Sequence, residues 1–140
     1  MMTGHTTAHT VESVMTVSPV VIAEEEAIAG VAELLAGYEI SGLPVVDVED
    51  RLVGVISSTD LVRLQGASVP WASWHGLIVR DLMSWPPQTI DASASLDEAA
   101  RRMTEARVHR LVVVDDDMAP VGVISESDLI REIADACDDC

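Results

Sequence analysis

The chain has 140 residues and a mass of 15.0 kDa, which accommodates one compact domain or two small repeats that share a core. Hydrophobic residues make up 49% of the chain, and they are nearly all aliphatic, which excludes disorder of the whole chain. Twenty-four Asp and Glu residues against eight Arg residues give a formal net charge of −16, which opposes binding to nucleic acid and to anionic membranes. We therefore expect neither nucleic acid nor a membrane among the partners.

The ends of the chain carry few functional signals. No apolar run approaches the roughly 20 residues that span a bilayer, and the first residues lack a secretory signal, so we expect a cytoplasmic protein. Cys137 and Cys140 form a terminal C-x-x-C with no second pair and no thioredoxin-like context, which favours a solvated tail over a zinc or redox site. His5 and His9 are four residues apart and would bind one metal ion only from a helix, which the terminal, threonine-rich segment around them disfavours. We expect no metal site.

An internal repeat organises the chain. Residues 11–63 align without a gap on residues 79–131, and 17 of the 53 aligned positions are identical. The identities include a VGVIS segment that is followed, two residues later, by Asp-Leu. The sequence therefore predicts two copies of one structural unit, with a connector at 64–78 and flexible tails at 1–10 and 132–140.

The elements expected in the first repeat follow from changes in its hydrophobic period. Residues 20–22 are a short extended segment, and a helix is expected over 24–37, where apolar residues recur at helical spacing after three glutamates suited to the helix dipole. Two β-rich runs at 43–47 and 51–57 flank an acidic turn and predict a hairpin. A last helix is expected to start near Thr59.

The second repeat shows the same order of elements. Residues 89–90 are extended, and a helix over 95–106 begins with a Ser-x-x-Glu capping box. A hairpin is expected from 111–115 and 119–125, and a last helix near Ser127. Each repeat is thus β-α-β-β-α, of the α/β (α+β) class. Because two short helices cannot cover both faces of a three-stranded sheet, we expect the pseudo-symmetric repeats to pack sheet to sheet.

Polar residues gather where the last strand of each repeat passes into the last helix. They are Ser57 with Asp60 and Ser125 with Asp128. A Ser hydroxyl and free N–H groups in the first helical turn suit phosphate oxygens, and an ionised Asp suits the two hydroxyls of a ribose. The same pattern is also explained without a ligand, by an N-cap at Thr59 or Ser127 with Asp in the first turn.

These motifs, each present twice and in order, resemble the tandem CBS domain pair, or Bateman module, over roughly residues 11–131. The resemblance implies a regulatory module that binds adenosine-containing ligands such as AMP, ADP, ATP, S-adenosylmethionine or NAD in two clefts between the repeats. It implies no required cofactor. With no further domain in the sequence, we expect a stand-alone pair that acts in trans on an unidentified regulated protein. No Ser/His/Asp arrangement or metal cluster indicates an enzyme.

The resemblance assigns roles to individual residues. It places phosphate and ribose on the four Ser and Asp residues named above. Where the first repeat has Ser41-Gly42, the second has His109-Arg110, in a Val-His-Arg-Leu segment like one that contacts nucleotide phosphates in the AMP-activated kinase γ subunit. The alternative is that Arg110 only neutralises the nearby acidic run at 115–117.

Six positions correspond to those that line an adenine slot in the family. They are Val17, Val20 and Ile40 in the first repeat and Trp85, Thr89 and Val108 in the second. Ordinary core packing also accounts for most of them. Trp85 is informative, because a large ring at that position either stacks on a base or fills the cleft.

Two further features concern partners. Trp71 and Trp74 in the connector suggest either a buried anchor or a partner surface. CBS pairs often dimerise through their helices, so a homodimer is expected, with 24–37 and 95–106 as candidate interface helices. The competing function is a structural protein-interaction module that binds no nucleotide.

Overall fold

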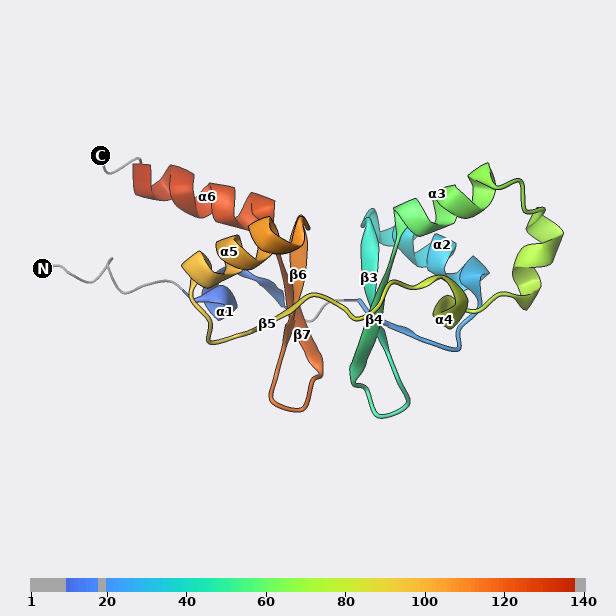
Figure 1. The fold of residues 1–140 in the computed structure, drawn as a ribbon, viewed down its shortest axis with the longest axis horizontal. Coiled ribbons are helices and arrows are strands. Elements are labelled where there is room, and N and C mark those ends of the chain that lie inside the picture. The colour runs from blue at the N-terminus through green and yellow to red at the C-terminus, as the bar shows by residue number, and fades with distance from the viewer. Residues whose placement is uncertain (1–9, 18–19, 138–140) are drawn as a thin grey trace, which may run out of the picture. The chain divides into compact units, whose positions relative to one another are not determined.

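The computed structural model describes residues 10–17 and 20–137, and these form two compact units (Figure 1). Unit 1 combines residues 10–17 with 88–137, and unit 2 comprises residues 20–87. Each unit contains one small sheet with helices, which confirms the α/β class.

Unit 1 contains a sheet with the strand order β1-β7-β6-β5. Its strands are β1 (Thr16–Val17), β5 (Thr89–Asp91), β6 (Arg110–Val114) and β7 (Pro120–Ser125). Its helices are α1 (Val11–Val14), α5 (Leu96–Ala106) and α6 (Glu126–Cys137). Strand β5 runs parallel to β6, whereas β6 and β7 form an antiparallel hairpin. Helices α5 and α6 contact each other and the sheet, and so enclose the core of this unit.

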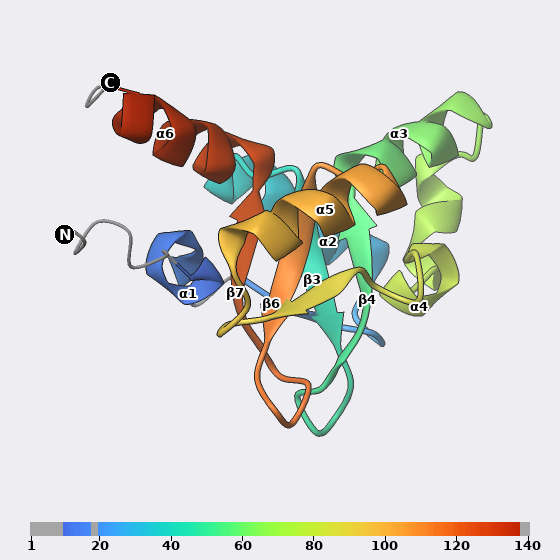
Figure 2. The ribbon, with the colours of Figure 1, turned by 60° about the vertical axis from the view of Figure 1, so that its left-hand side comes forward.

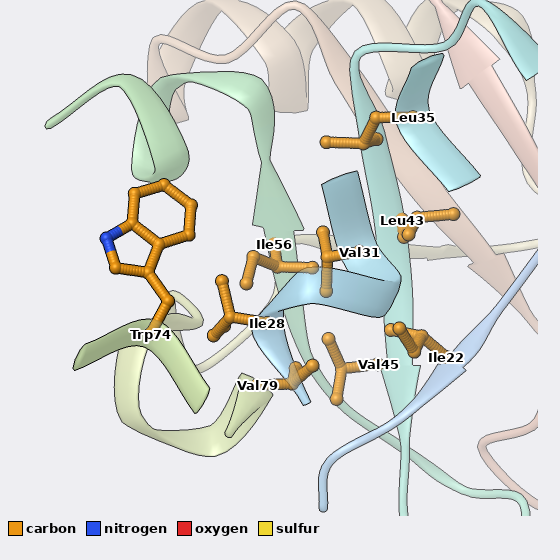
Figure 3. Packing of buried hydrophobic residues seen from close by; sticks show 9 residues of the cluster. All are labelled: Ile22, Ile28, Val31, Leu35, Leu43, Val45, Ile56, Trp74 and Val79. Atoms are coloured by element: carbon orange, nitrogen blue, oxygen red, sulfur yellow. The ribbon is translucent and has the colours of Figure 1, made fainter. Parts of the chain in front are cut away.

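Unit 2 contains a three-stranded sheet with the order β2-β3-β4. Its strands are β2 (Ile22–Ala23), β3 (Gly42–Val46) and β4 (Leu52–Ser57). Its helices are α2 (Ile28–Tyr38), α3 (Ser58–Gly66), the 3₁₀ helix η2 (Trp71–Gly76) and α4 (Val79–Leu82). Figure 3 shows the core of unit 2, in which side chains from α2, from both long strands and from the connector pack together. The strand-helix-hairpin-helix order expected from the periodicity is therefore present in both repeats.

The two hairpins close with acidic turns that lie far from the last helices, as Figure 2 shows for β6–β7 and α6. In the β3–β4 turn, Asp47 accepts hydrogen bonds from the backbone N–H groups of Glu49 (2.8 Å) and Arg51 (3.0 Å). The bond from Arg51 is the main cause that lowers the pKa of Asp47 below its ordinary value. Asp115 accepts the equivalent bonds in the β6–β7 turn. Asp47 and Asp115, which occupy equivalent positions of the two repeats, thus stabilise the turns.

The compact units do not coincide with the sequence repeats, because each unit takes its first short helix from the other repeat. The N–H of Val11 donates to the carbonyl of Ala94, and the N–H of Val79 donates to the carbonyl of Glu26, both at 2.9 Å. The segments that follow these helices pair in the same way. Thr16 pairs with Val123 on β7, and Ser84 forms a bridge with Val55 on β4. The start of each repeat therefore completes the sheet that the other repeat builds.

This exchange explains the glycine of the shared VGVIS segment. A Cβ atom at Gly54 would lie 2.7 Å from the sulfur of Met83 and 2.8 Å from the carbonyl oxygen of Ser84. A Cβ atom at Gly122 would likewise lie 2.8 Å from the carbonyl oxygen of Thr16 and too close to Met15. Only glycine lets the exchanged backbone lie directly on the strand.

Two boundaries differ from the sequence expectations. Helix α2 starts at Ile28 rather than at residue 24, because Glu24 and Glu25 form a turn and pair with Arg80 of α4 instead of the helix dipole. Helix α6 continues to Cys137, so 132–137 are helical rather than a tail. Cys137 is exposed, whereas Cys140, His5 and His9 lie outside the described residues.

The structure decides between the two roles considered for the connector tryptophans in the case of Trp74, which is a buried anchor. Trp74 is 4% exposed, lies in the core of unit 2, and donates from Nε1 to the carbonyl of Val69 at 3.1 Å (Figure 3). Trp71 is 61% exposed, and its ring centroid lies 4.3 Å from that of Trp74. Trp74 is therefore the anchor that ties the connector to unit 2, and Trp71 covers it from the solvent side.

We predict that Gly54→Ala and Gly122→Ala each lower the free energy of unfolding by about 1–3 kcal/mol, because the added methyl group meets backbone rather than a flexible side chain. Chemical denaturation measures this effect. Gly37→Ala is the matched control, since α2 leaves open space there, and it should raise stability by about 0.5–1 kcal/mol. A Gly54→Ala protein as stable as the wild type would show that the exchanged segment does not lie on β4.

Candidate functional site

In unit 2, the junction between β4 and α3 holds a linked serine and aspartate. The N–H of Ser57 donates to Oδ2 of Asp60 at 2.8 Å, and the Ser57 hydroxyl donates to the same oxygen at 3.1 Å. The side chain of Asp60 is 11% exposed. The start of α3 is also bonded to the residue that precedes β3, because the N–H of Ser58 donates to the carbonyl of Ser41 at 2.8 Å. The carboxylate is thus fixed at the end of a sheet strand.

In unit 1, the junction between β7 and α6 repeats this geometry. The N–H and the hydroxyl of Ser125 donate to Oδ2 of Asp128 at 2.8 Å and 3.1 Å. The side chain of Asp128 is 6% exposed, so this carboxylate is also nearly buried. Neither aspartate lacks partners within the chain, and the burial of each is compensated by these bonds.

The helix caps differ from the ligand-free alternative inferred from the sequence. That alternative placed the N-cap at Thr59 or Ser127, but α3 starts at Ser58 and α6 at Glu126. The capping residue of α3 is Ser57, and its partner in the capping box is Asp60. The residues expected to hold a ligand therefore also cap the helix, so the two explanations concern the same side chains.

Two basic residues lie beside the junction of unit 1. Arg110 stands opposite Ser125 across the β6–β7 ladder, and the N–H of Glu126 donates to the carbonyl of His109 at 2.9 Å. The ring Nδ1 of His109 lies 3.0 Å from Oε1 of Glu126, and both side chains are exposed. The structure thus brings His109, Arg110, Ser125 and Asp128 to one end of the hairpin.

The alternative role for Arg110 was neutralisation of the acidic run at 115–117. Arg110 begins β6, whereas this run follows the other end of the same strand. Asp115 lies five residue steps after Arg110 along the extended strand, a backbone distance of about 16 Å. The acidic turn therefore lies beyond the reach of a direct ion pair with Arg110.

The candidate adenine positions are grouped differently from the expectation based on the repeats. Because the first segments are exchanged, Val17 belongs to unit 1 together with Thr89 and Val108, whereas Trp85 belongs to unit 2 together with Val20 and Ile40. Within each unit the exchanged residue is the exposed one, with 65% of Val17 and 73% of Trp85 exposed.

The other candidate positions have roles in packing. Val20 and Ile40 are partly buried against the core of unit 2, and Val108 against that of unit 1. The carbonyl of Thr89 accepts a hydrogen bond from Arg102 at 2.7 Å. Core packing therefore accounts for part of this set, as the sequence also allowed.

Sequence reasoning missed two charged residues next to the aspartates. Arg131 donates to Oδ1 of Asp128, whereas Nη1 of Arg63 lies 4.0 Å from Oδ1 of Asp60. The signal was present, because an Asp and an Arg three residues apart on a helix lie on the same face. Both arginines occupy the same position in the repeat.

The described residues contain neither a candidate metal site nor a membrane-spanning helix. Within residues 10–17 and 20–137, no group of three or more His, Cys, Asp and Glu residues is placed to hold a metal ion. No helix in the described part of the chain is long and apolar enough to cross a membrane.

Comparison with known proteins gives consistent matches. The family profile described as the CBS domain matches residues 11–66 and 79–135. The CBS domain-containing protein CBSX2 of Arabidopsis thaliana, which is chloroplastic, is 31% identical over 123 residues, covering 71% of this chain and 52% of that protein. The chain thus spans about half the length of the curated relatives CBSX1 and CBSX2.

Solved structures show the same fold. The crystal structure of CBSX2 in complex with AMP has a TM-score of 0.79 and 31% identity, and the match covers 91% of this chain and 98% of that one. The CBS domain pair of protein MJ0100, solved with 5′-methylthioadenosine and S-adenosyl-L-methionine, has a TM-score of 0.78 at 23% identity, with 92% and 98% covered. Its likeness supports the fold alone.

We predict that Asp60→Ala and Asp128→Ala each cost about 1 kcal/mol of unfolding free energy, because each removes the carboxylate that accepts from the serine N–H at the start of a helix. Asp→Asn at the same positions should cost less, since the amide oxygen still accepts from the serine N–H. Urea denaturation of the four variants measures this difference. Equal stability of the alanine variants and the wild type would contradict the capping role.

Proposed function

Because the chain belongs to the CBS domain family, we propose that it is a regulatory module that binds an adenosine-containing ligand and carries out no chemistry of its own. The observation that carries the proposal is the duplicated serine–aspartate link at the end of β4 and of β7. The 31% identity with CBSX2, whose structure was solved with AMP, favours a nucleotide over other small molecules.

The chemistry of the link suits a nucleoside. In each unit the cap uses Oδ2 of the aspartate, so the ribose hydroxyls would donate to Oδ1, on the other side of the carboxylate. The serine hydroxyl and the first N–H groups of the helix would meet the phosphate. A ligand can therefore bind without breaking the bond that fixes the carboxylate.

We assign further contacts on the same basis. His109 and Arg110 lie beside Ser125 and would supply positive charge to a phosphate, which the net charge of −16 otherwise repels. Val17 and Trp85 expose apolar side chains that would pack against an adenine ring. We propose that the ligand is AMP, ADP, ATP, S-adenosylmethionine or NAD, and that it binds in both units.

The regulatory part of the proposal concerns a partner. A ligand shifts a conformational equilibrium only by the difference between its affinities for the two states, so the module must present a ligand-dependent surface. We propose that it acts in trans on another protein and that it forms a homodimer through its helices. Location in the cytoplasm stays a prediction from the sequence.

We predict that AMP at 100 times its dissociation constant stabilises the protein by about 2.7 kcal/mol per site and raises the melting temperature by roughly 5–10 °C. Differential scanning fluorimetry with AMP, ADP, ATP, S-adenosylmethionine and NAD measures the shift. Asp60→Asn combined with Asp128→Asn should abolish the shift, because both ribose acceptors lose their charge while the caps persist.

Asp116→Asn combined with Asp117→Asn is the matched control, since it removes the same two charges from the exposed β6–β7 turn and should leave the shift unchanged. No shift with any of the five compounds would reject nucleotide binding. It would favour the competing function, a structural interaction module, and dimerisation and partner capture would then survive the double substitution of Asp60 and Asp128.

A further inference from the structure

The imidazole of His109 is paired with Glu126 where β7 passes into α6. Its Nδ1 lies 3.0 Å from Oε1 of Glu126. The backbone N–H of Glu126 also donates to the carbonyl of His109 at 2.9 Å, so the two residues are held side by side. Because the backbone already places them together, the side chains pair at little further cost in conformational entropy.

This contact selects one tautomer of the neutral ring. An ionised carboxylate only accepts hydrogen bonds, so Nδ1 of His109 must carry the proton that lies between the two side chains. An exposed pair of this kind shifts a two-state equilibrium by up to about fivefold, which makes the Nδ1–H tautomer the main form. The other nitrogen, Nε2, then holds a lone pair and is an acceptor. The neutral ring therefore offers no donor to a phosphate, whose oxygens are also acceptors.

Protonation reverses this property of the ring. The imidazolium carries a proton on both nitrogens, so Nδ1 keeps its bond to Glu126 while Nε2 becomes a charged donor. Histidine is the side chain that gains such a charge between pH 5 and 8. The contact that His109 can make with a phosphate therefore depends on pH.

Charges of both signs lie around the ring. Besides Glu126, the charged side chains on the neighbouring turns of α5, β6 and α6 are Glu105, Arg107, Arg110, Asp128 and Arg131. Asp128 is engaged by Ser125 and Arg131, whereas Glu126 makes the contact with the ring. Three of these six groups are negative and three are positive, so protonation of His109 gives this corner a net positive charge as well as a donor.

Unit 2 has the same backbone contact without the titratable pair. The positions equivalent to His109 and Glu126 are Ser41 and Ser58. The N–H of Ser58 donates to the carbonyl of Ser41 at 2.8 Å, so the backbone bond is present in both units and the side chains differ. The corner of unit 2 is therefore a reference within the same chain for the corner of unit 1.

We propose that Glu126 is a positioning residue that makes nucleotide binding in unit 1 depend on pH, because it keeps the proton of neutral His109 away from the phosphate. Binding at this corner then takes up a proton and tightens as the pH falls from 8.0 to 6.5. This inference rests on the proposed function and adds a regulatory input to it. The module responds to acidity together with the adenosine ligand.

Isothermal titration with AMP at pH 8.0 and 6.5 tests this dependence in two single-site proteins. Asp60→Asn leaves the corner of unit 1, and Asp128→Asn leaves that of unit 2, which measures the change due to the ionisation of AMP itself. Relative to that reference, the corner of unit 1 should bind about tenfold more tightly at pH 6.5, because it gains one charge-assisted hydrogen bond.

Two substitutions in the Asp60→Asn protein separate the ring from the carboxylate. His109→Gln should reduce the change to less than about twofold, because the titrating group is absent. Glu126→Gln should reduce it to about threefold and tighten binding at pH 8.0, since an amide can turn its oxygen or its NH₂ group to Nδ1 and so allows a proton on Nε2 of the neutral ring. His75→Gln is the matched control, since His75 lies in the connector, and should keep the full change.

A second measurement needs no ligand. Nitrogen-15 NMR of the imidazoles at pH 8.0 in the full chain reports which ring nitrogen carries the proton. His109 should carry it on Nδ1 in the wild type and on Nε2 in Glu126→Gln, the form that free imidazole side chains favour in water. His75 should show the Nε2 form in both proteins.

The outcomes separate this inference from the function on which it rests. A proton on Nε2 of His109 at pH 8.0 in the wild type would overturn the inference and leave the proposed function standing. AMP binding whose pH dependence is unchanged by His109→Gln or by Glu126→Gln would do the same. Absence of binding by every adenosine compound at both pH values would reject the proposed function and the proton-linked binding with it.

Discussion

The hydrogen bond from a serine N–H to the carboxylate three residues later fixes the corner where each hairpin passes into its last helix. In both units the donor is the final residue of a strand and the acceptor lies in the first helical turn, at 2.8 Å. This bond compensates the burial of an ionised side chain and starts the helix at the same point. Because the bond uses only Oδ2, the outer face of the carboxylate keeps a defined direction.

Under the proposed function, the same corner serves structure and binding without conflict. A side chain that only capped a helix would need one acceptor oxygen, and a side chain that only bound a ribose would have to be ordered by the ligand itself. Here the cap orders Asp60 and Asp128 before a ligand arrives, which lowers the entropic cost of binding. The exchange of the first segments, which Gly54 and Gly122 permit, adds Val17 or Trp85 to the same unit.

The sequence predicted the order of the elements and the positions of the serines and aspartates, because hydrophobic periods, turn residues and a repeat are local properties of the chain. The ungapped match of 11–63 on 79–131 also identified the residues that the two repeats share. The exchange of the first helices was not predictable in this way. Pairing of Val11 with Ala94 depends on tertiary contact across more than 80 residues, which no local pattern records.

Other features of the structure were predictable from the sequence only in part. The start of α2 was misplaced because Glu24 and Glu25 suit a helix dipole as well as an ion pair, and only the fold brings Arg80 to them. The pairing of Asp128 with Arg131 was visible as a helical spacing, but its contrast with Asp60 and Arg63 depends on side-chain placement. The packing of the two repeats sheet to sheet and the roles of the individual site residues stay predictions.

A crystal structure of the chain grown with AMP tests the central claim most directly. The account predicts that the ribose hydroxyls donate to the outer oxygen of Asp60 while the Ser57 N–H still donates to the inner one. AMP bound away from both serine–aspartate corners, or bound there only after the capping bond is broken, would contradict it.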